Sequence, residues 1–328
     1  MIQFISKFTT QLQEAYEIGS NSDLKTTNKK ITSVIICGSG GSGIGGKIVS
    51  QIAEKHSQVP FVTHNTYSLP NFVDENTLVV ISSYSGNTEE TVSAFKEALK
   101  RNSEIACVTS GGEIQRIANE NNTNCIIIPG GNPPRAMLTY SLTQLFFILN
   151  NYGIINGDFK TDLTSSILLL NNEVESIKEE AKKVTEIIKN KTILIYTDVS
   201  FEGVGTRFKQ QLNENSKTLA YSNIIPEMNH NELLGWNGGN DSFSAIFLRN
   251  ETDNKRNQVR MEISKEVVSK KTNSVVDVFS KGNSEIERTL YLILLTDWVS
   301  VYLADEYGVD AIEIKVIDHL KHELSKEK

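Results

Sequence analysis

Short apolar segments alternate with helical segments through the first half of the chain, and this alternation limits the fold more than any other feature. The apolar segments are rich in Val and Ile and have no polar face, which is typical of buried parallel strands. They lie at residues 33–37, 61–63, 78–82, 105–109 and 125–128, with helical patterns at 43–56, 89–100, 113–121 and 135–150. This order predicts a doubly wound α/β sheet flanked by helices.

The same alternation begins again after Gly153. Further strands are predicted at 193–196, 218–221, 244–248 and 274–278, with helices at 164–189, 204–215, 256–268 and 285–305. Ser284 and Glu287 form a capping-box pattern before the last of these helices. We therefore expect two α/β domains, residues 1–153 and 154–310, each with a mostly parallel sheet.

The chain ends are predicted to be helical. Residues 2–18 carry apolar side chains close to a 3.6-residue period. In the C-terminal segment 311–328, apolar residues recur at four-residue steps, which predicts a helix that docks on the rest of the protein. The helical segments 135–150 and 290–303 are apolar nearly all round, so we expect them to be buried between layers or between subunits, and a homo-oligomer would suit them.

Composition excludes several classes of partner. The net charge of −7 and the pI near 5.4, without a basic stripe, argue against a nucleic-acid partner. The longest apolar stretch, 290–295, is too short for a membrane span, and the N-terminus lacks the pattern of a signal peptide. Three separated cysteines suggest neither a disulfide framework nor a zinc ribbon. We expect a cytoplasmic protein without a membrane partner.

A glycine-rich turn, residues 38–46, follows the first predicted strand and opens a helix. It matches the dinucleotide pattern G-x-G-x-x-G in two registers. A nicotinamide site also needs an acidic residue about 20 positions further on, and Thr63, His64 and Asn65 stand there instead. A turn that merely packs helix on strand would explain the glycines too. The residues favour a turn whose N–H groups, with Ser42, face a ligand at the carboxyl end of the sheet.

A second turn, residues 82–88, joins a predicted strand to a helix and is rich in hydroxyls. Ser83, Ser85 and Thr88 could donate to phosphate oxygens, while the start of the helix supplies free N–H groups and a partial positive charge. The alternative is an ordinary N-cap, since Ser, Asn and Thr are common cap residues. One cap needs one hydroxyl, so three of them favour an anion site.

These motifs resemble those of a known family. Residues 83–91 are similar to the phosphate loop of the sugar isomerase (SIS) domain. Together with Gly40–Gly46, Pro134–Ala136 and Glu227–Glu232, they resemble the bifunctional phosphoglucose/phosphomannose isomerases, nearly end to end. The resemblance implies two SIS domains, a homodimer, phosphate binding by Gly41, Ser42, Ser83, Ser85 and Thr88, and interconversion of an aldose 6-phosphate with fructose 6-phosphate without a cofactor. A non-catalytic SIS protein that only binds a sugar phosphate is the alternative.

The resemblance also implies catalytic roles for residues that would otherwise be ordinary surface side chains. Glu214, in the last turn of a predicted helix, stands sixteen positions before His230, as the family's catalytic base stands before its histidine. The helix dipole would make this carboxylate more basic, whereas the residues alone favour a solvated glutamate near Lys217. By resemblance, His230 opens the sugar ring in the partner subunit's site, and Arg135 faces the enediolate.

The family's essential lysine, on its final helix, matches Lys321 best, with Lys315 as the second choice. In this segment Ala311 replaces the family's proline, and no threonine lies between Gly308 and Lys321. A small hydroxyl there is thought to help these enzymes accept the mannose epimer, so activity on mannose 6-phosphate is left open. No histidine has a second ligand at a recognised metal-binding spacing, and we predict no metal.

Overall fold

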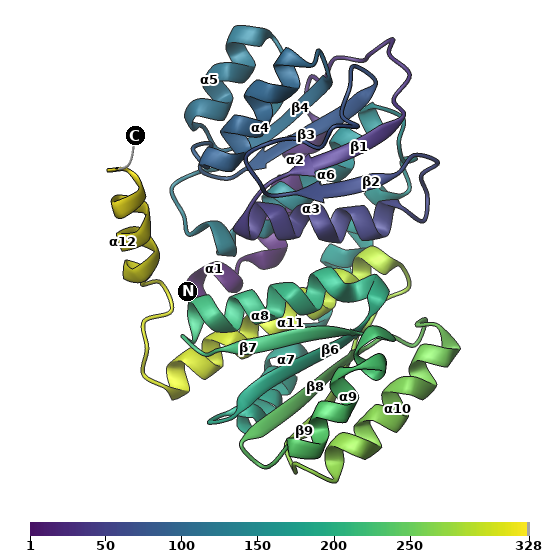
Figure 1. Cartoon of the computed structure of the whole chain (residues 1–328), viewed down its shortest axis with the longest axis vertical. Coiled ribbons are helices and arrows are strands. Elements are labelled where there is room, and N and C mark those ends of the chain that lie inside the picture. Colours follow the sequence, from purple (N-terminus) through teal and green to yellow (C-terminus); the bar gives the residue numbers. More distant parts are fainter. Residues whose placement is uncertain (327–328) are drawn as a thin grey trace.

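The first sheet lies in the N-terminal half of the chain. In the computed structural model, which describes residues 1–326, its five strands are parallel and run in the order β2-β1-β3-β4-β5 (Figure 1). They are β1 Ser33–Cys37, β2 Phe61–His64, β3 Thr77–Ser83, β4 Glu104–Thr109 and β5 Asn124–Ile127. The predicted parallel sheet is confirmed.

Helices cover both faces of this sheet. They are α2 Phe8–Ser20, α3 Gly40–Ala53, α4 Glu89–Lys100, α5 Gly112–Asn121 and α6 Leu138–Asn151. Alternate residues of β1 enter different cores because successive side chains of a strand point to opposite faces. Val34 and Ile36 pack in the cluster that holds α2, α3 and α6, while Ile35 and Cys37 pack with α4 and α5.

The second sheet has four parallel strands in the order β7-β6-β8-β9. They are β6 Thr192–Asp198, β7 Ala220–Ile225, β8 Phe243–Arg249 and β9 Val275–Phe279. The helices around them are α7 Phe159–Ile188, α8 Glu202–Asn215, α9 Glu232–Gly235, α10 Lys255–Ser269 and α11 Glu285–Glu306. Ser284 caps α11 in the predicted box with Glu287. One face packs on α7, α8 and α11, and the other on α10 and the segment after β7.

The two halves are joined by one continuous apolar cluster that includes α2, α3 and α6 from the first half and α7, α8 and α11 from the second. Helices α3 and α8 lie against each other between the sheets (Figure 1). Lys47 and Glu202 form an ion pair across this contact, and the Gly203 N–H donates to Gln51 Oε1. The contact places the carboxyl end of α8 beside the turns of the first sheet.

Two predictions about helices need correction, and of the two alternatives given for the apolar helices the structure supports burial between layers. The predicted helix over 2–18 is two helices, α1 Ile2–Ile5 and α2, separated at Ser6 and Lys7. The predicted helix over 135–150 begins as a separate 3-10 helix, η1 Pro134–Ala136, before α6. Nearly all of α6 and α11 is buried within the chain itself, so their apolar character does not indicate a subunit interface.

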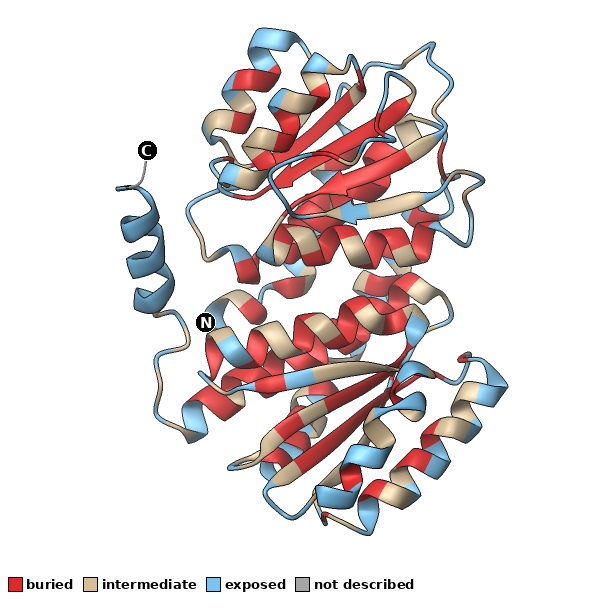
Figure 2. Ribbon diagram, viewed as in Figure 1, coloured by how far each residue is buried: buried red, intermediate tan, exposed pale blue. Residues whose placement is uncertain are grey.

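The C-terminal helix, α12 Lys315–Leu324, forms as predicted but does not dock. None of its residues is buried, and Val316, Leu320 and Leu324 are exposed (Figure 2). It stands apart from both sheets (Figure 1). Its apolar face therefore finds no partner within residues 1–326.

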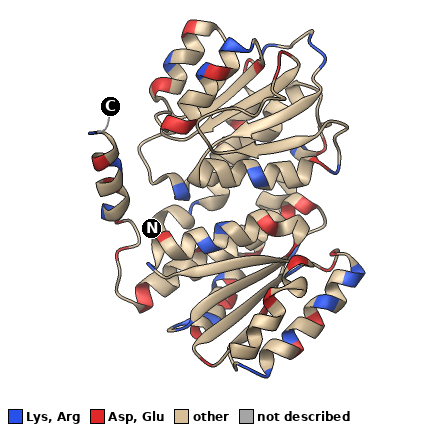
Figure 3. Cartoon of the chain, viewed as in Figure 1, with Lys and Arg blue, Asp and Glu red and all other residues tan. Residues whose placement is uncertain are grey.

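Charged side chains of both signs are interspersed over the outer helices, while the strands are largely uncharged (Figure 3). Among the helices that the structure describes, none is long and apolar enough to cross a membrane.

Candidate functional site

The two predicted anion turns lie side by side. Strands β1 and β3 are neighbours with Cys37 opposite Ile81, so the turns that follow them meet at the same edge of the sheet. Ser42, in the first turn of α3, accepts a hydrogen bond at Oγ from the Tyr84 N–H at 3.1 Å. The hydroxyls of Ser83 and Thr88 lie 3.0 Å apart. The structure thus brings together the side chains predicted to hold phosphate.

The hydroxyls at these turns are not used as helix caps. Ser39 and Thr88 are the N-cap residues of α3 and α4, and neither side chain makes a capping hydrogen bond within the part of the chain that the structure describes. Ser85 is exposed, and its Oγ accepts from the Asn87 N–H at 3.3 Å. Asn87 instead caps the neighbouring helix, because its Oδ1 accepts from the Glu113 N–H at 2.9 Å. The first turns of α3 and α4 keep donors for an anion.

Arg135 lies next to the first of these turns. A Cβ placed on Gly41 would be 3.7 Å from Pro134 O and 3.9 Å from Arg135 Cα. The Arg135 side chain is only 5% exposed. Its Nε donates to Asn215 Oδ1 at 2.8 Å, and its Nη2 donates to the carbonyl oxygens of Ala311 and Ile312. Burial lowers the pKa of Arg135, opposed by Glu214 and Asp310, but a guanidinium stays charged at any physiological pH.

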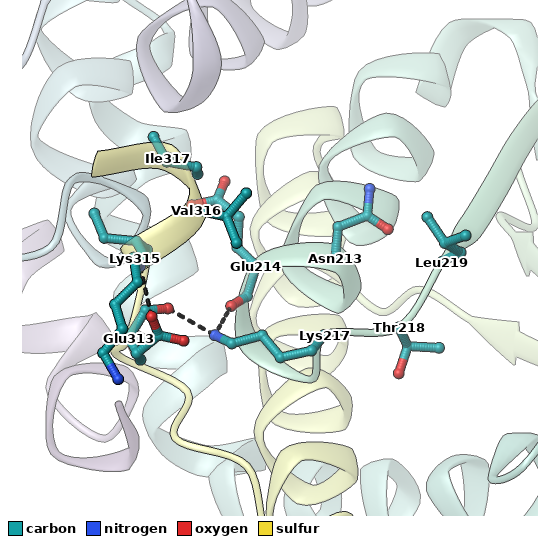
Figure 4. A pocket seen from close by; sticks show the side chains of 10 residues that line it. Asn213, Glu214, Lys217, Thr218, Leu219, Glu313, Lys315, Val316 and Ile317 are labelled. Atoms are coloured by element: carbon teal, nitrogen blue, oxygen red, sulfur yellow. Dashed lines mark hydrogen bonds between the residues drawn. The ribbon is translucent and has the colours of Figure 1, made fainter. Parts of the chain in front are cut away.

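Glu214 faces this guanidinium. Its Oε2 lies 3.5 Å from Arg135 Nη1, and the side chain is 31% exposed. Glu214 also lines a cavity of about 410 Å³ between the end of α8 and the start of α12 (Figure 4). The sequence-based alternative of a purely solvated glutamate does not describe this partly buried carboxylate, which has a cation beside it and open space in front of it.

Lys217 closes one side of the cavity. It has a positive φ of 55°, and its Nζ donates to the main-chain oxygens of Glu214 and Glu313 (Figure 4). Burial and the charge of Arg135 lower its pKa. Lys217 therefore binds the Glu214 main chain rather than neutralising the Glu214 carboxylate.

His230 does not join this group within one chain. It is exposed at the end of the 3-10 helix η3 Glu227–His230, which follows the carboxyl end of β7. Glu214 precedes the other end of β7, and six residues of strand span about 20 Å. The structure places these two side chains at opposite ends of the second sheet.

The two candidate lysines differ in position. Lys315 lines the cavity beside Glu214, whereas Lys321 is exposed on α12 and is not part of the cavity lining. Within residues 1–326, the Lys321 ammonium has no hydrogen-bond or ion-pair partner. The structure therefore leaves Lys321 apart from Arg135 and Glu214.

Sequence reasoning missed the buried polar residues behind the site. Arg207, Gln211 and Asn215 are each at most 2% exposed, and they contact Asp297 and Ser300 of α11. Arg207, Gln211 and Asn215 are four residues apart, which places them on one face of α8. This spacing is visible in the sequence, but it does not reveal that the face is buried.

Within residues 1–326, no three His, Cys, Asp or Glu side chains are grouped so that they could hold a metal ion. The residues that come together are a hydroxyl-rich sheet edge, a buried guanidinium and a carboxylate, in that spatial order. Such an arrangement can bind the phosphate of a ligand and move a proton beside a fixed positive charge.

Two parallel sheets flanked by helices, the first with hydroxyl-rich turns after β1 and β3, are the features of a protein of the SIS class. Residues 28–152 match the SIS domain, and residues 177–324 match the bacterial phospho-glucose isomerase C-terminal SIS domain. The fold is similar to the C-terminal domain of glucosamine-fructose-6-phosphate aminotransferase from Francisella tularensis, with a TM-score of 0.76 at 12% identity, over 95% of this chain and 98% of that one.

More similar sequences narrow the class to a family. The chain is 37% identical to a bifunctional phosphoglucose/phosphomannose isomerase of Caldicellulosiruptor bescii, over 99% of both chains. It is 36% identical to one of Aquifex aeolicus, over 89% of this chain and 90% of the relative. The chain belongs to the bifunctional phosphoglucose/phosphomannose isomerase family.

Proposed function

We propose that this protein interconverts glucose 6-phosphate and fructose 6-phosphate through an enediolate, without a metal or other cofactor. The observation that carries the proposal is the position of Arg135 between the phosphate turns and Glu214, 3.5 Å from that carboxylate. A sugar phosphate held at the turns would present its reactive carbons to this pair. The relatives are named as isomerases of the same reaction class, which supports the proposal.

Each residue has a role in the proposed reaction. Glu214 takes the proton from C2 of the open-chain aldose and returns it to C1, while Arg135 stabilises the negative charge that forms on the enediolate oxygens. Gly41, Ser42, Ser83, Ser85 and Thr88 bind the phosphate. The active-site lysine of the proposal is Lys321, with Lys315 as the alternative that already lines the cavity.

His230 completes the proposed site from a second subunit. Within one chain, the length of β7 separates His230 from Glu214. His230 could therefore act at the site that contains Glu214 only if it came from the other subunit of a homodimer. Residues 1–153 supply the phosphate turns and Arg135 in this proposal, and residues 154–310 supply the carboxylate and the histidine. We place the enzyme in the cytoplasm.

Mannose 6-phosphate is the proposed second substrate. The relatives are named as phosphomannose isomerases as well as phosphoglucose isomerases. This chain differs from the family pattern in having Ala311 and in lacking a threonine between Gly308 and Lys321. Assays of both aldose phosphates side by side, with and without EDTA, decide the epimer preference and test the metal-free mechanism.

Replacing the carboxylate tests the proposal most directly. We expect Glu214→Gln to lower kcat by about 100- to 10,000-fold, because the amide cannot accept the proton, while calorimetry still shows fructose 6-phosphate binding near the wild-type affinity. Exchange of the C1 hydrogen of fructose 6-phosphate with deuterated water, followed by NMR, should disappear with it.

Glu179→Gln is the matched control, since Glu179 is exposed on α7 away from the site and should keep full turnover. Full activity in Glu214→Gln would refute the proposed mechanism. Binding of fructose 6-phosphate by the wild type without hydrogen exchange would favour the alternative, a non-catalytic sugar-phosphate-binding protein.

A further inference from the structure

The Arg135 guanidinium is held on two sides and free on the third. Nε donates to Asn215 Oδ1 at 2.8 Å, and Nη2 donates to Ala311 O and to Ile312 O at 3.2 Å. Nη1 lies toward Glu214 and makes no hydrogen bond within residues 1–326. Nη1 is therefore the nitrogen that a ligand could contact. The hydrogen bonds of Nε and Nη2 would keep the guanidinium plane in place meanwhile.

Asn215 is itself fixed in one orientation. It is fully buried, and its Nδ2 donates to Ser300 Oγ at 2.9 Å. The Ser300 hydroxyl donates onward to the Asp297 main-chain oxygen at 2.7 Å, so it can only accept from Asn215. This chain of donors leaves Asn215 Oδ1 facing Arg135, where it must serve as an acceptor.

The main chain of Arg135 is tied to the same helix pair. Arg207 Nη2 donates to Arg135 O at 3.0 Å and to Asp297 Oδ2 at 2.7 Å. Gln211 Nε2 donates to the second oxygen of that carboxylate at 2.9 Å. Asp297 thus supports both the Arg207 contact to the Arg135 main chain and, through Ser300, the Asn215 contact to its side chain.

We propose that Asn215 and Arg207 are positioning residues that fix the Arg135 guanidinium for the reaction at Glu214. This inference rests on the proposed isomerase function. Arg135 belongs to the first half of the chain, whereas Asn215, Arg207 and Asp297 belong to α8 and α11 of the second. The network therefore sets the alignment of the two halves at the point where charge develops, and a preorganised cation needs no rearrangement in the transition state.

The test removes the acceptor without removing bulk. Asn215→Leu should lower kcat by up to about 100-fold, since small displacements of a charged group are costly, and should change the affinity for fructose 6-phosphate little because the phosphate turns are untouched. Asn215→Asp keeps an acceptor for Arg135 Nε and should recover part of the lost kcat.

A double-mutant comparison separates positioning from general destabilisation. Arg135→Lys has no Nε, so adding Asn215→Leu to it should cause no further loss of kcat. Leu212→Ala, in the fully buried apolar row of the same helix, is the control; it should lower the unfolding midpoint while leaving kcat near wild type.

An equal loss of kcat from Asn215→Leu in the wild-type and Arg135→Lys backgrounds would overturn the inference while leaving the proposed function standing. An unchanged kcat in Asn215→Leu would also overturn the inference and leave the proposed function standing. A wild-type protein without isomerase activity would instead refute the proposed function, and this inference with it.

Discussion

Gly86, in the second anion turn, has a φ of +70° and no space for a side chain. A Cβ at this position would lie 1.8 Å from Gly111 O and 2.8 Å from Thr109 Oγ1. The turn that carries Ser85 and Thr88 can therefore form only with glycine here. This is the residue-level reason why the hydroxyls approach the carboxyl edge of the sheet so closely.

We expect Gly86→Ala to raise KM for the sugar phosphate and to destabilise the fold, because the main chain of the turn must shift. Gly153→Ala is a matched control, since Gly153 also has a positive φ, +68°, but nothing lies within 4 Å of its Cβ position. That control should cost only about 1–2 kcal/mol of stability, the strain of a left-handed alanine, and leave KM unchanged. Steady-state kinetics and urea unfolding measure both effects, and an unchanged KM in Gly86→Ala would contradict the phosphate-binding role.

Helix α8 contributes to the hydrophobic core with one face and to the candidate site with another. Val204, Phe208 and Leu212 pack in the main core, while Arg207 and Asn215 reach α11 and Arg135. The ion pair of Arg207 with Asp297 is almost completely buried. Removal of one partner from such a pair typically costs 3–5 kcal/mol, so these residues contribute to the packing of α8 on α11 as well as to the site.

The connection from β8 to α10 contains a carboxyl group with a strongly shifted pKa. Burial raises the pKa of Asp253 from 3.8 to about 6, although hydrogen bonds from the Asn250 N–H and side chain oppose the shift. Between about pH 4 and 6 the unfolded chain loses this proton before the folded protein does. The free energy of unfolding contributed by this group therefore falls as the pH rises through that window and is constant above it.

Asp253→Asn should remove this dependence. We expect the stability of the variant relative to wild type to increase by on the order of 2 kcal/mol between pH 4 and pH 7, because the pKa of Asp253 is raised from 3.8 to about 6 in the folded protein. Urea unfolding at both pH values measures it. Glu251→Gln, an exposed residue of the same connection, is the control. A constant difference between wild type and Asp253→Asn at the two pH values would contradict the assignment.

At the scale of the whole molecule, one chain holds two halves of the proposed site at different places. Arg135 and Glu214 meet where α8 reaches the first sheet, while His230 stands exposed at the far end of β7. The exposed apolar face of α12 is a second feature that finds no partner among residues 1–326. Both features are consistent with assembly from more than one subunit.

Mixed dimers test the shared site. Glu214→Gln and His230→Ala should each be inactive alone, but a dimer with one chain of each kind contains one site with both lesions and one site with neither. Co-expression with two affinity tags, followed by tandem purification, should therefore restore about half of the wild-type activity per dimer. If Glu214 and His230 act within the same chain, every site carries one lesion and no activity returns.

Local residue patterns were enough to predict the strands, the helices and the turns between them. Parallel strands that are buried on both faces must be apolar throughout, so they and their connecting helices could be predicted within a few residues, including α4 and the Ser284 cap. The conformation of the hydroxyl-rich turns was predictable because it depends on residues that are close in sequence, such as Ser83 and Thr88; their phosphate-binding role stays a prediction. Arg135 and Glu214 were identified as candidates only through a family resemblance.

Tertiary structure decided which of these candidates meet. Arg135 and Glu214 are 79 positions apart, and their contact depends on the packing of α3 against α8, which no local pattern encodes. The burial of Arg207 and Asn215 likewise depends on α11, so their spacing alone predicted nothing about the site. The periodicity of α12 predicted a docked helix, but docking requires a complementary surface, and within residues 1–326 none of the α12 residues is buried against one. Local sequence fixes backbone conformation, whereas the site is a product of contacts between distant segments.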